Sequence, residues 1–210
     1  SDRAGLYAAA LDRLRAAGFV YPCFCSREEV RRELDAMFGA PHLAPQGPDG
    51  PLYPGRCRGL DPSAAQARLD AGAPCAWRLN VEAAAARVGP LNASVDGETR
   101  RADGARLGDV ALARKDGAAA YHLAVVVDDA AQAVDLVTRG ADLAPAADLH
   151  RLLDALLDAQ PPRWRHHPLV RDEDGMRLAK RADSKSLAAL RAGGETPETI
   201  RARLAPLGWP

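Results

Sequence analysis

The order of apolar and polar positions predicts helices near both ends of the chain. Tyr7, Leu11 and Leu14 fall on one helical face, and Gly18 follows at a position where a helix can end. The same periodicity predicts further helices over residues 27–37, over residues 63–71, through the stripe Leu149, Leu152, Leu153, Leu156 and Leu157, and through Ile200 and Leu204 after the cap Thr196 and Pro197.

Extended segments and loops are expected between these helices. Residues 39–59 are rich in Gly and Pro, which predicts a loop that needs something to hold it. Short apolar runs in residues 75–114 suggest a small antiparallel sheet. The continuous apolar run from Tyr121 to Val127 is typical of a strand buried on both faces of an α/β sheet, and residues 168–180 suggest a short strand followed by a loop.

The composition of the chain excludes some classes of protein but does not indicate a particular function. The chain has 210 residues, 47% of them hydrophobic and 27% charged, as in an ordinary globular protein. We find no basic-then-apolar start and no apolar stretch near the roughly 20 residues of a membrane span, so we expect a cytoplasmic protein without a membrane partner. Lys plus Arg equals Asp plus Glu at 28 each, so any nucleic-acid site would be a local basic patch.

Three cysteines gather around the Gly/Pro-rich loop. Cys23 and Cys25 bracket one residue, and Cys57 lies beyond the loop. Without a secretory signal a metal site is favoured over disulfides. Zinc prefers four ligands in a tetrahedron, with sulfur or nitrogen donors. We therefore expect a structural zinc ion that replaces the hydrophobic core this loop lacks.

The fourth zinc ligand stays open from the residues alone. Tyr53 lies four residues before Cys57, His42 lies in the same loop, and water could also occupy the position. The alternative is that the cysteines are buried free thiols, but the loop offers them little apolar surface. Cys75 lies in an apolar context and is expected to be a core residue.

Three more residues have side chains suited to chemistry. Tyr121 begins the apolar run, where its phenol could face a cleft. Arg139 lies in a Gly-containing turn, where a guanidinium could clamp a carboxylate in bidentate fashion. Lys180 lies in a basic loop of the kind that reaches polyphosphate. Alone, a tyrosine at such a position is more often a packing residue, and a lone arginine or lysine in a loop is usually a solvated surface charge.

Taken in order, these segments resemble the second half of the catalytic domain of glutamyl-type class I aminoacyl-tRNA synthetases. The matching blocks are DVALARKDGAAAYHLAVVVDD, TRGADL, WRHHPL and GMRLAKR. The last resembles the family's KMSKS loop in a degenerate form, with Arg177 at the first lysine position and Ala179 in place of a hydroxyl residue. The resemblance covers essentially the whole chain.

A narrower resemblance is to the short glutamyl-Q branch of this family, which loads glutamate onto queuosine in the anticodon of tRNA(Asp). The pattern C-x-C…Y-x-x-x-C of that branch matches Cys23, Cys25, Tyr53 and Cys57. The chain also stops about 30 residues after the lysine loop, so we expect no anticodon-binding domain.

The resemblance implies roles for the matching residues. Tyr121 and Arg139 would line the glutamate pocket, and Lys180 would contact the phosphates of ATP, with Mg²⁺ as its companion ion. Zinc would be held by the cysteines and Tyr53. The implied partners are glutamate, ATP and the anticodon arm of tRNA(Asp), and the protein is expected to be a monomer.

The expected fold class is α/β: a Rossmann-like class I synthetase catalytic domain with a zinc-containing α+β insert. We expect residues 1–19 to be a helix of the nucleotide-binding domain, 20–108 the zinc-containing, tRNA-contacting insert, and 109–210 the second half of the catalytic domain. The family's opening HIGH-type segment has no match in this sequence. Two other functions therefore remain: a truncated glutamyl-tRNA synthetase, and a non-catalytic, zinc-stapled tRNA-binding module.

Overall fold

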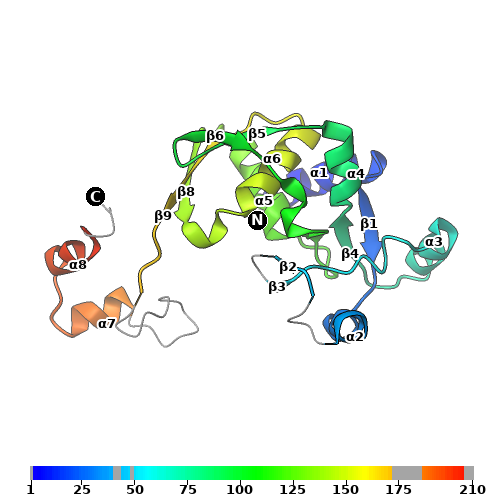
Figure 1. Ribbon diagram of the computed structural model, residues 1–210, viewed down its shortest axis with the longest axis horizontal. Helices are drawn as coiled ribbons and strands as arrows, with labels where there is room; N and C mark the ends of the chain where they lie inside the picture. Colours follow the sequence, from blue (N-terminus) through cyan, green and yellow to red (C-terminus); the bar gives the residue numbers. More distant parts are fainter. Residues whose placement is uncertain (1, 40–43, 48–49, 172–185, 206–210) are drawn as a thin grey trace.

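The computed structural model describes residues 2–39, 44–47, 50–171 and 186–205. Its helices are α1 (Ala4–Ala16), α2 (Arg27–Phe38), α3 (Pro62–Asp70), α4 (Val81–Val88), α5 (Tyr121–Ala131), α6 (Ala146–Leu156), α7 (Leu187–Ala192) and α8 (Pro197–Leu204), with the 3-10 turns η2 (Gly104–Leu107) and η3 (Ala141–Leu143). Its strands are β1 (Val20–Cys23), β2 (Gln46–Gly47), β3 (Gly50–Pro51), β4 (Ala76–Leu79), β5 (Asn92–Val95), β6 (Glu98–Arg101), β7 (Ala111–Ala113), β8 (Leu136–Gly140) and β9 (Arg163–His167) (Figure 1).

Two sheets divide the strands between them, apart from the short β2–β3 pair. The first is antiparallel, in the order β1-β4-β7. The second has the order β6-β5-β9-β8, with β9 parallel to both of its neighbours. Parallel neighbours require a crossover connection, and α6 supplies it between β8 and β9. This β8–α6–β9 unit is the α/β part of the fold.

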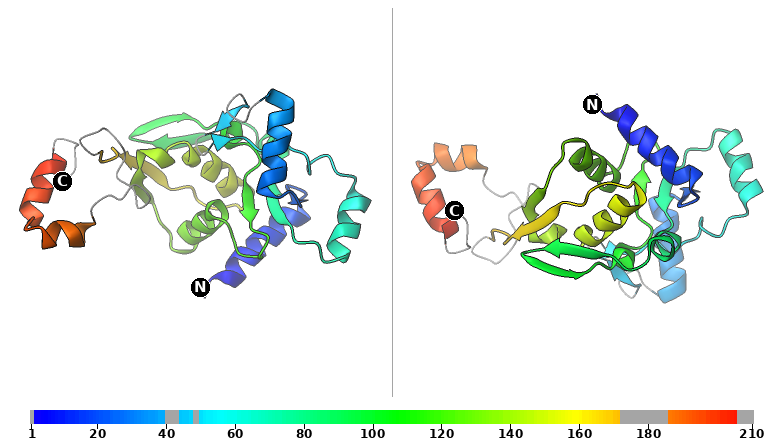
Figure 2. Two further views of the ribbon diagram at one scale, coloured as in Figure 1. Left: turned by 90° about the horizontal axis from the view of Figure 1, so that it is seen from below. Right: turned by 90° about the horizontal axis from the view of Figure 1, so that it is seen from above.

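The core lies where α1, α5 and α6 meet the antiparallel sheet. Figure 2 shows the ribbon in two further views. Its fully buried side chains are mostly leucines: Leu14, Leu79, Leu112, Leu123, Leu149 and Leu153. Polar contacts also tie α1 to α5. The Asp128 carboxylate accepts hydrogen bonds from the Tyr7 hydroxyl at 2.9 Å and from the Arg3 guanidinium at 3.0 Å. Helices α7 and α8 lie at one end of the long axis (Figure 1).

The prediction of a buried strand over Tyr121–Val127 was wrong, because this segment is the first part of helix α5. Leu123 and Val126, three positions apart, are its buried residues. The remaining apolar positions are partly covered, since α5 packs against α1, α6 and β7. A helix covered on several sides has a nearly continuous apolar run, which periodicity alone does not distinguish from a buried strand.

Other expectations had mixed outcomes. The helices expected from the N-terminal stripe, the leucine stripe and the Thr196 cap are confirmed as α1, α6 and α8. Antiparallel strands do form within residues 75–114, but they belong to two separate sheets. Helix α4 separates β4, in the first sheet, from β5, in the second, along the sequence. No strand lies in the described residues 168–171. The strand of this region is β9, which ends at His167.

The described residues thus form a mixed α/β structure, as expected. Within them, no helix is long and apolar enough to cross a membrane.

Candidate functional site

A group of polar side chains lies where three neighbouring strands end. Arg139 and His166 are opposite each other in the register of the parallel strands β8 and β9. Asp96 follows directly after β5, the other neighbour of β9. Ligand sites of open α/β sheets are typically found at the carboxyl ends of parallel strands. The topology therefore places these three residues where such a site is expected.

Arg139 is the centre of this group. Its Nε donates a hydrogen bond to His166 Nε2 at 3.3 Å. Its Nη1 lies 3.4 Å from the Tyr121 hydroxyl and 3.1 Å from His150 Nδ1. Its Nη2 is buried and has no hydrogen-bond partner among the described residues. A buried guanidinium nitrogen of this kind is suited to a carboxylate, which forms charge-assisted hydrogen bonds with arginine.

His150 and His122 extend the group into the core. His150 is 2% exposed, and its Nε2 lies 3.1 Å from His122 Nδ1. Burial lowers the pKa of His150 well below its ordinary value, and the positive charge of Arg139 and the nearby His122 lower it further. The imidazole of His150 is therefore neutral, and its Nδ1 accepts the hydrogen bond from Arg139.

Tyr121 reaches the site from the first position of helix α5. The preceding loop is shaped by Arg114 and Asp116, which form an ion pair, and by Gly117, whose φ of 80° suits glycine. Tyr121 is 46% exposed, and the centroid of its ring lies 5.7 Å from that of His150. Tyr121 and Arg139, which are 18 residues apart in the sequence, thus lie side by side.

A second site gathers the three cysteines and Tyr53. The sulfur atoms of Cys23, Cys25 and Cys57 all lie within 4.8 Å of one another, and the thiols are free. The Tyr53 hydroxyl lies 3.4 Å from Cys23 Sγ and 3.5 Å from Cys25 Sγ. It also accepts a hydrogen bond from the Cys57 backbone N–H at 2.9 Å. Three sulfurs and one oxygen therefore converge on one point.

This donor set fits zinc. Zn–S bonds of about 2.3 Å at tetrahedral angles put sulfur atoms roughly 3.8 Å apart, close to the spacing here. Burial raises the pKa of the Cys25 thiol to about 11. Burial also raises the pKa of Cys57, but hydrogen bonds from Tyr53 and from backbone groups outweigh burial and lower it overall. A bound cation would stabilise all three thiolates, because a coordinated thiol is deprotonated.

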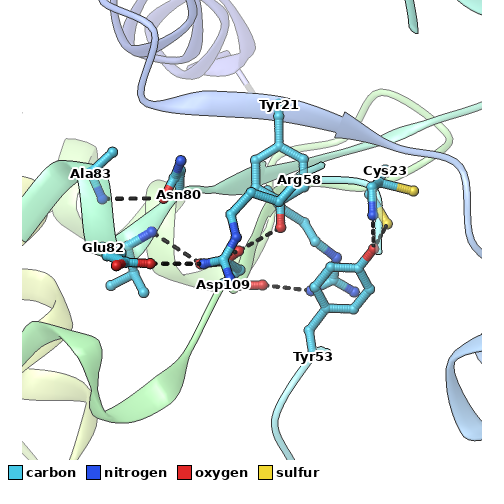
Figure 3. A network of polar contacts seen from close by, with 11 residues as sticks. Tyr21, Cys23, Tyr53, Arg58, Asn80, Glu82, Ala83 and Asp109 are labelled. Atoms are coloured by element: carbon cyan, nitrogen blue, oxygen red, sulfur yellow. Dashed lines mark hydrogen bonds and ion pairs between the residues drawn. The ribbon is translucent and has the colours of Figure 1, made fainter. Parts of the chain in front are cut away.

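Asp109 connects the loop that carries Tyr53, Cys57 and Arg58 to the antiparallel sheet (Figure 3). Its carboxylate is buried and accepts hydrogen bonds from the Tyr21 hydroxyl at 2.6 Å and the Val81 N–H at 3.1 Å. It also pairs with Arg58 at 3.4 Å, next to Cys57 in the sequence. Arg78 donates to the Asp109 carbonyl and lies 3.9 Å from the centre of the Tyr53 ring. The loop is thus anchored by charge as well as by its thiols.

The structure therefore brings together two sets of residues that the sequence singled out: Cys23, Cys25, Tyr53 and Cys57 in one place, and Tyr121 with Arg139 in another. Lys180 and His42 lie outside the described residues. Sequence reasoning missed the parts played by Asp96, Asp109 and His150. The Asp-Gly pair at residues 96–97 is typical of a hairpin turn, but such a pair does not indicate a contact with His166.

The family model for class I tRNA synthetases (E and Q), catalytic domain, matches residues 1–210. The chain belongs to this family, and its mixed α/β structure is part of a class I synthetase catalytic domain. Among individual relatives, a glutamyl-Q tRNA(Asp) synthetase of Rhodobacter capsulatus is 40% identical over 96% of this chain and 72% of its own length. A glutamate–tRNA ligase 2 of Nitrosococcus oceani is 34% identical over 99% of this chain and 42% of its own length.

Solved structures agree on the fold. The glutamate–tRNA synthetase of Elizabethkingia anophelis superimposes with a TM-score of 0.67 at 23% identity, over 86% of this chain and 36% of that one. The chain spans only 61% to 72% of the length of the four glutamyl-Q tRNA(Asp) synthetases that it matches almost throughout.

Proposed function

We propose that the protein activates glutamate with ATP and transfers it to queuosine in the anticodon of tRNA(Asp). The single observation that carries this proposal is the Arg139 guanidinium, held beside Tyr121 with a buried, unpartnered Nη2. A carboxylate of glutamate would supply the missing partner. The names of the relatives at about 40% identity support queuosine as the acceptor.

In this proposal Arg139 and Tyr121 recognise glutamate. The guanidinium provides a fixed charge, and the phenol provides a hydroxyl at the open side of the site. Neutral His150 accepts from Nη1 and adds no competing positive charge. Rate enhancement would come from positioning and from fixed charges around the reacting groups, without a covalent enzyme intermediate. Lys180 is proposed to contact the ATP phosphates, with Mg²⁺, and so to stabilise pyrophosphate as it leaves.

We also propose that Cys23, Cys25, Cys57 and Tyr53 hold a structural zinc ion. Bound there, the ion would cross-link β1 to the loop that follows residue 50. Tyr53 is favoured over His42 as fourth ligand because its hydroxyl lies against Cys23 and Cys25 and accepts from the Cys57 N–H. Residues 20–108, which carry this site, are proposed to form the insert that contacts tRNA.

The first test is glutamate-dependent ATP–pyrophosphate exchange, measured on this chain and on the product of its complete gene. We expect exchange with the complete product, and a loss of about 100-fold in kcat/KM for glutamate in Arg139→Lys, because lysine is unable to form the paired guanidinium contacts. Arg163→Lys is the matched control, since Arg163 lies on the same sheet with an exposed side chain.

The second test separates the acceptors. Labelled glutamate is offered with tRNA(Asp) containing queuosine, the same tRNA lacking it, and tRNA(Glu). Labelling of the first tRNA alone supports the proposal, and labelling of the 3′ end of tRNA(Glu) supports a glutamyl-tRNA synthetase. A third outcome is that the complete protein is folded, holds zinc and binds tRNA tightly, but catalyses no ATP–pyrophosphate exchange. This outcome would support a non-catalytic tRNA-binding module.

A further inference from the structure

Asp96, His166 and Arg139 form a continuous hydrogen-bonded chain across the ends of β5, β9 and β8. Asp96 Oδ1 accepts from the His166 backbone N–H at 2.6 Å, and both carboxylate oxygens lie 3.2 Å from His166 Nδ1. On the other side of the ring, His166 Nε2 lies 3.3 Å from Arg139 Nε. The His166 side chain is 2% exposed, so the middle of this chain is shielded from water, whereas the Asp96 side chain at its end is 49% exposed.

The chemistry of the three groups fixes where the protons lie. A carboxylate only accepts, so His166 Nδ1 carries the proton and donates to Asp96. A guanidinium only donates, so His166 Nε2 must be the unprotonated, accepting nitrogen. Burial raises the pKa of Asp96, but the hydrogen bonds from His166 outweigh burial and lower it, which keeps the carboxylate ionised. Only the Nδ1–H tautomer of His166 satisfies both neighbours.

The same arrangement immobilises the guanidinium of Arg139. His166 holds Nε, while His150 and Tyr121 lie at Nη1. Nη2 alone is left without a partner among the residues that the structure describes. The direction in which Nη2 points therefore depends on the tautomer of a histidine that Arg139 contacts, and through it on Asp96.

We propose that Asp96 is a positioning residue for substrate recognition: it holds His166 in the Nδ1–H tautomer, and His166 in turn orients Arg139 so that Nη2 faces the carboxylate of the substrate. Asp96 touches neither substrate nor Arg139 and acts through His166. The inference rests on the proposed function insofar as the carboxylate belongs to glutamate.

Asp96→Asn is the informative substitution, because it keeps the shape of the side chain. The amide oxygen can still accept from the His166 backbone N–H, but the amide NH2 then faces His166 Nδ1 and donates to it. His166 must move its proton to Nε2, where it meets the Nε–H of Arg139. We expect the KM for glutamate to rise about tenfold, the cost of one lost charge-assisted hydrogen bond, while the KM for ATP changes less than about twofold. Glu98→Gln in the same hairpin is the control, since Glu98 is exposed.

A double-mutant cycle with His166→Gln distinguishes positioning from a merely structural effect. A glutamine amide oxygen can accept the hydrogen bond from Arg139 Nε–H whether residue 96 is Asp or Asn, because glutamine has no tautomer for residue 96 to select. Adding Asp96→Asn to His166→Gln should therefore raise the KM for glutamate by less than about twofold more, as expected for coupled residues. An equal, tenfold effect of Asp96→Asn in both backgrounds would overturn the proposal, because the loss would then come from the turn itself.

Nitrogen-15 NMR of the histidine rings tests the tautomer without any substrate. We expect a protonated Nδ1 and an unprotonated Nε2 for His166 in the full-length protein, and the reverse in Asp96→Asn. A protonated Nε2 in the unsubstituted protein would overturn the proposal. If the expected tautomers are found but the protein shows no glutamate-dependent exchange, the proposed function fails, and the control of Arg139 by Asp96 stands.

Discussion

At the scale of single residues, two of the buried titratable groups of helix α6, His150 and Asp154, respond to pH in opposite ways. His150 and Asp154 are each 2% exposed. Burial lowers the pKa of His150, and burial raises the pKa of Asp154 to about 7. Nearby Arg151 lowers the pKa of Asp154, and Asp129 raises it. Asp154 Oδ2 has no hydrogen-bond partner among the described residues, which leaves its negative charge poorly compensated.

Asp154→Asn should stabilise the protein at alkaline pH. Because the pKa of Asp154 is raised in the folded state, its contribution to stability is complete below about pH 4 and is lost as the pH rises through about 7. The amide cannot ionise, so we expect a gain of about 1–3 kcal/mol in the free energy of unfolding at pH 8 that vanishes near pH 4. Urea unfolding at both pH values measures it. The exposed Glu98→Gln should show no such difference, and an equal gain at both pH values would contradict this explanation.

His150→Gln should weaken the loss of stability in mild acid. The pKa of His150 is lowered in the folded state, so its contribution is present above about pH 6.5 and is lost as the pH falls below that value. The slope that it adds is at most about 1.4 kcal/mol per pH unit. Unfolding curves between pH 7 and pH 5 should therefore be less steep in pH for the variant. Identical slopes would mean that His150 takes up a proton in the folded protein.

The sequence identifies some site residues better than others. Arg139 and Tyr121 are recognisable because each stands in a local motif, the TRGADL turn and the R-x-D-G-x-x-x-Y run. Asp96 is 70 residues from its partner His166, and His150 falls within an ordinary leucine-rich helical stripe. Their contacts are created by strand pairing and helix packing, so local patterns carry no sign of them.

At the scale of elements, α5 shows how tertiary packing overrides local preference. Its consecutive valines favour a strand, because β-branched side chains are restricted in a helix. Each such residue costs a helix only about 0.5 kcal/mol, whereas burying one of these apolar side chains contributes about 1.5–3 kcal/mol. The surrounding α1, α6 and β7 therefore decide the conformation.

Leu123→Ala tests the packing of α5. Leu123 is fully buried between these elements, so its truncation should cost about 2–5 kcal/mol of stability. Leu136→Ala is the matched control, because Leu136 is 42% exposed on the first position of β8 and should cost less than about 1 kcal/mol. Chemical denaturation measures both. Similar losses in the two variants would contradict the core position of Leu123.

At the scale of the whole molecule, most helices could be predicted from periodicity, but the division into two sheets could not. Register and parallel pairing depend on which distant segments meet, as with β5 and β9, which lie about 70 residues apart. The cysteine site is the exception. Its residue types and spacing were sufficient to predict a cluster, because few other functions require three thiols around a loop that is poor in apolar residues.

Removing the proposed zinc ion should lower the stability of the whole chain. We expect one zinc per chain, and a fall in Tm of roughly 6–12 °C on chelation if the site contributes about 3 kcal/mol. Cys57→Ser should lose the metal, whereas Cys75→Ser, outside the cluster, should keep it. Metal content and thermal unfolding are measured together. A metal-free protein with an unchanged Tm in all variants would exclude a structural ion.

The fourth ligand has its own test. Tyr53→Phe should weaken zinc affinity, while His42→Ala should leave it unchanged, as measured by competition with a chromogenic chelator. The reverse result would assign the position to His42.

The convergence of the thiols also bears on how this region tolerates changes of length. Cys25 and Cys57 are 32 positions apart, and their sulfur atoms lie 3.4 Å from each other. The chain between them is therefore a loop whose two ends are in contact without a covalent bond. The entropic free-energy cost of closing such a loop grows only with the logarithm of its length, by about 0.6 kcal/mol for each doubling. Helix α2 and the segment that follows it could thus lengthen or shorten considerably among relatives at little thermodynamic cost, provided that Cys25 and Cys57 remain in contact.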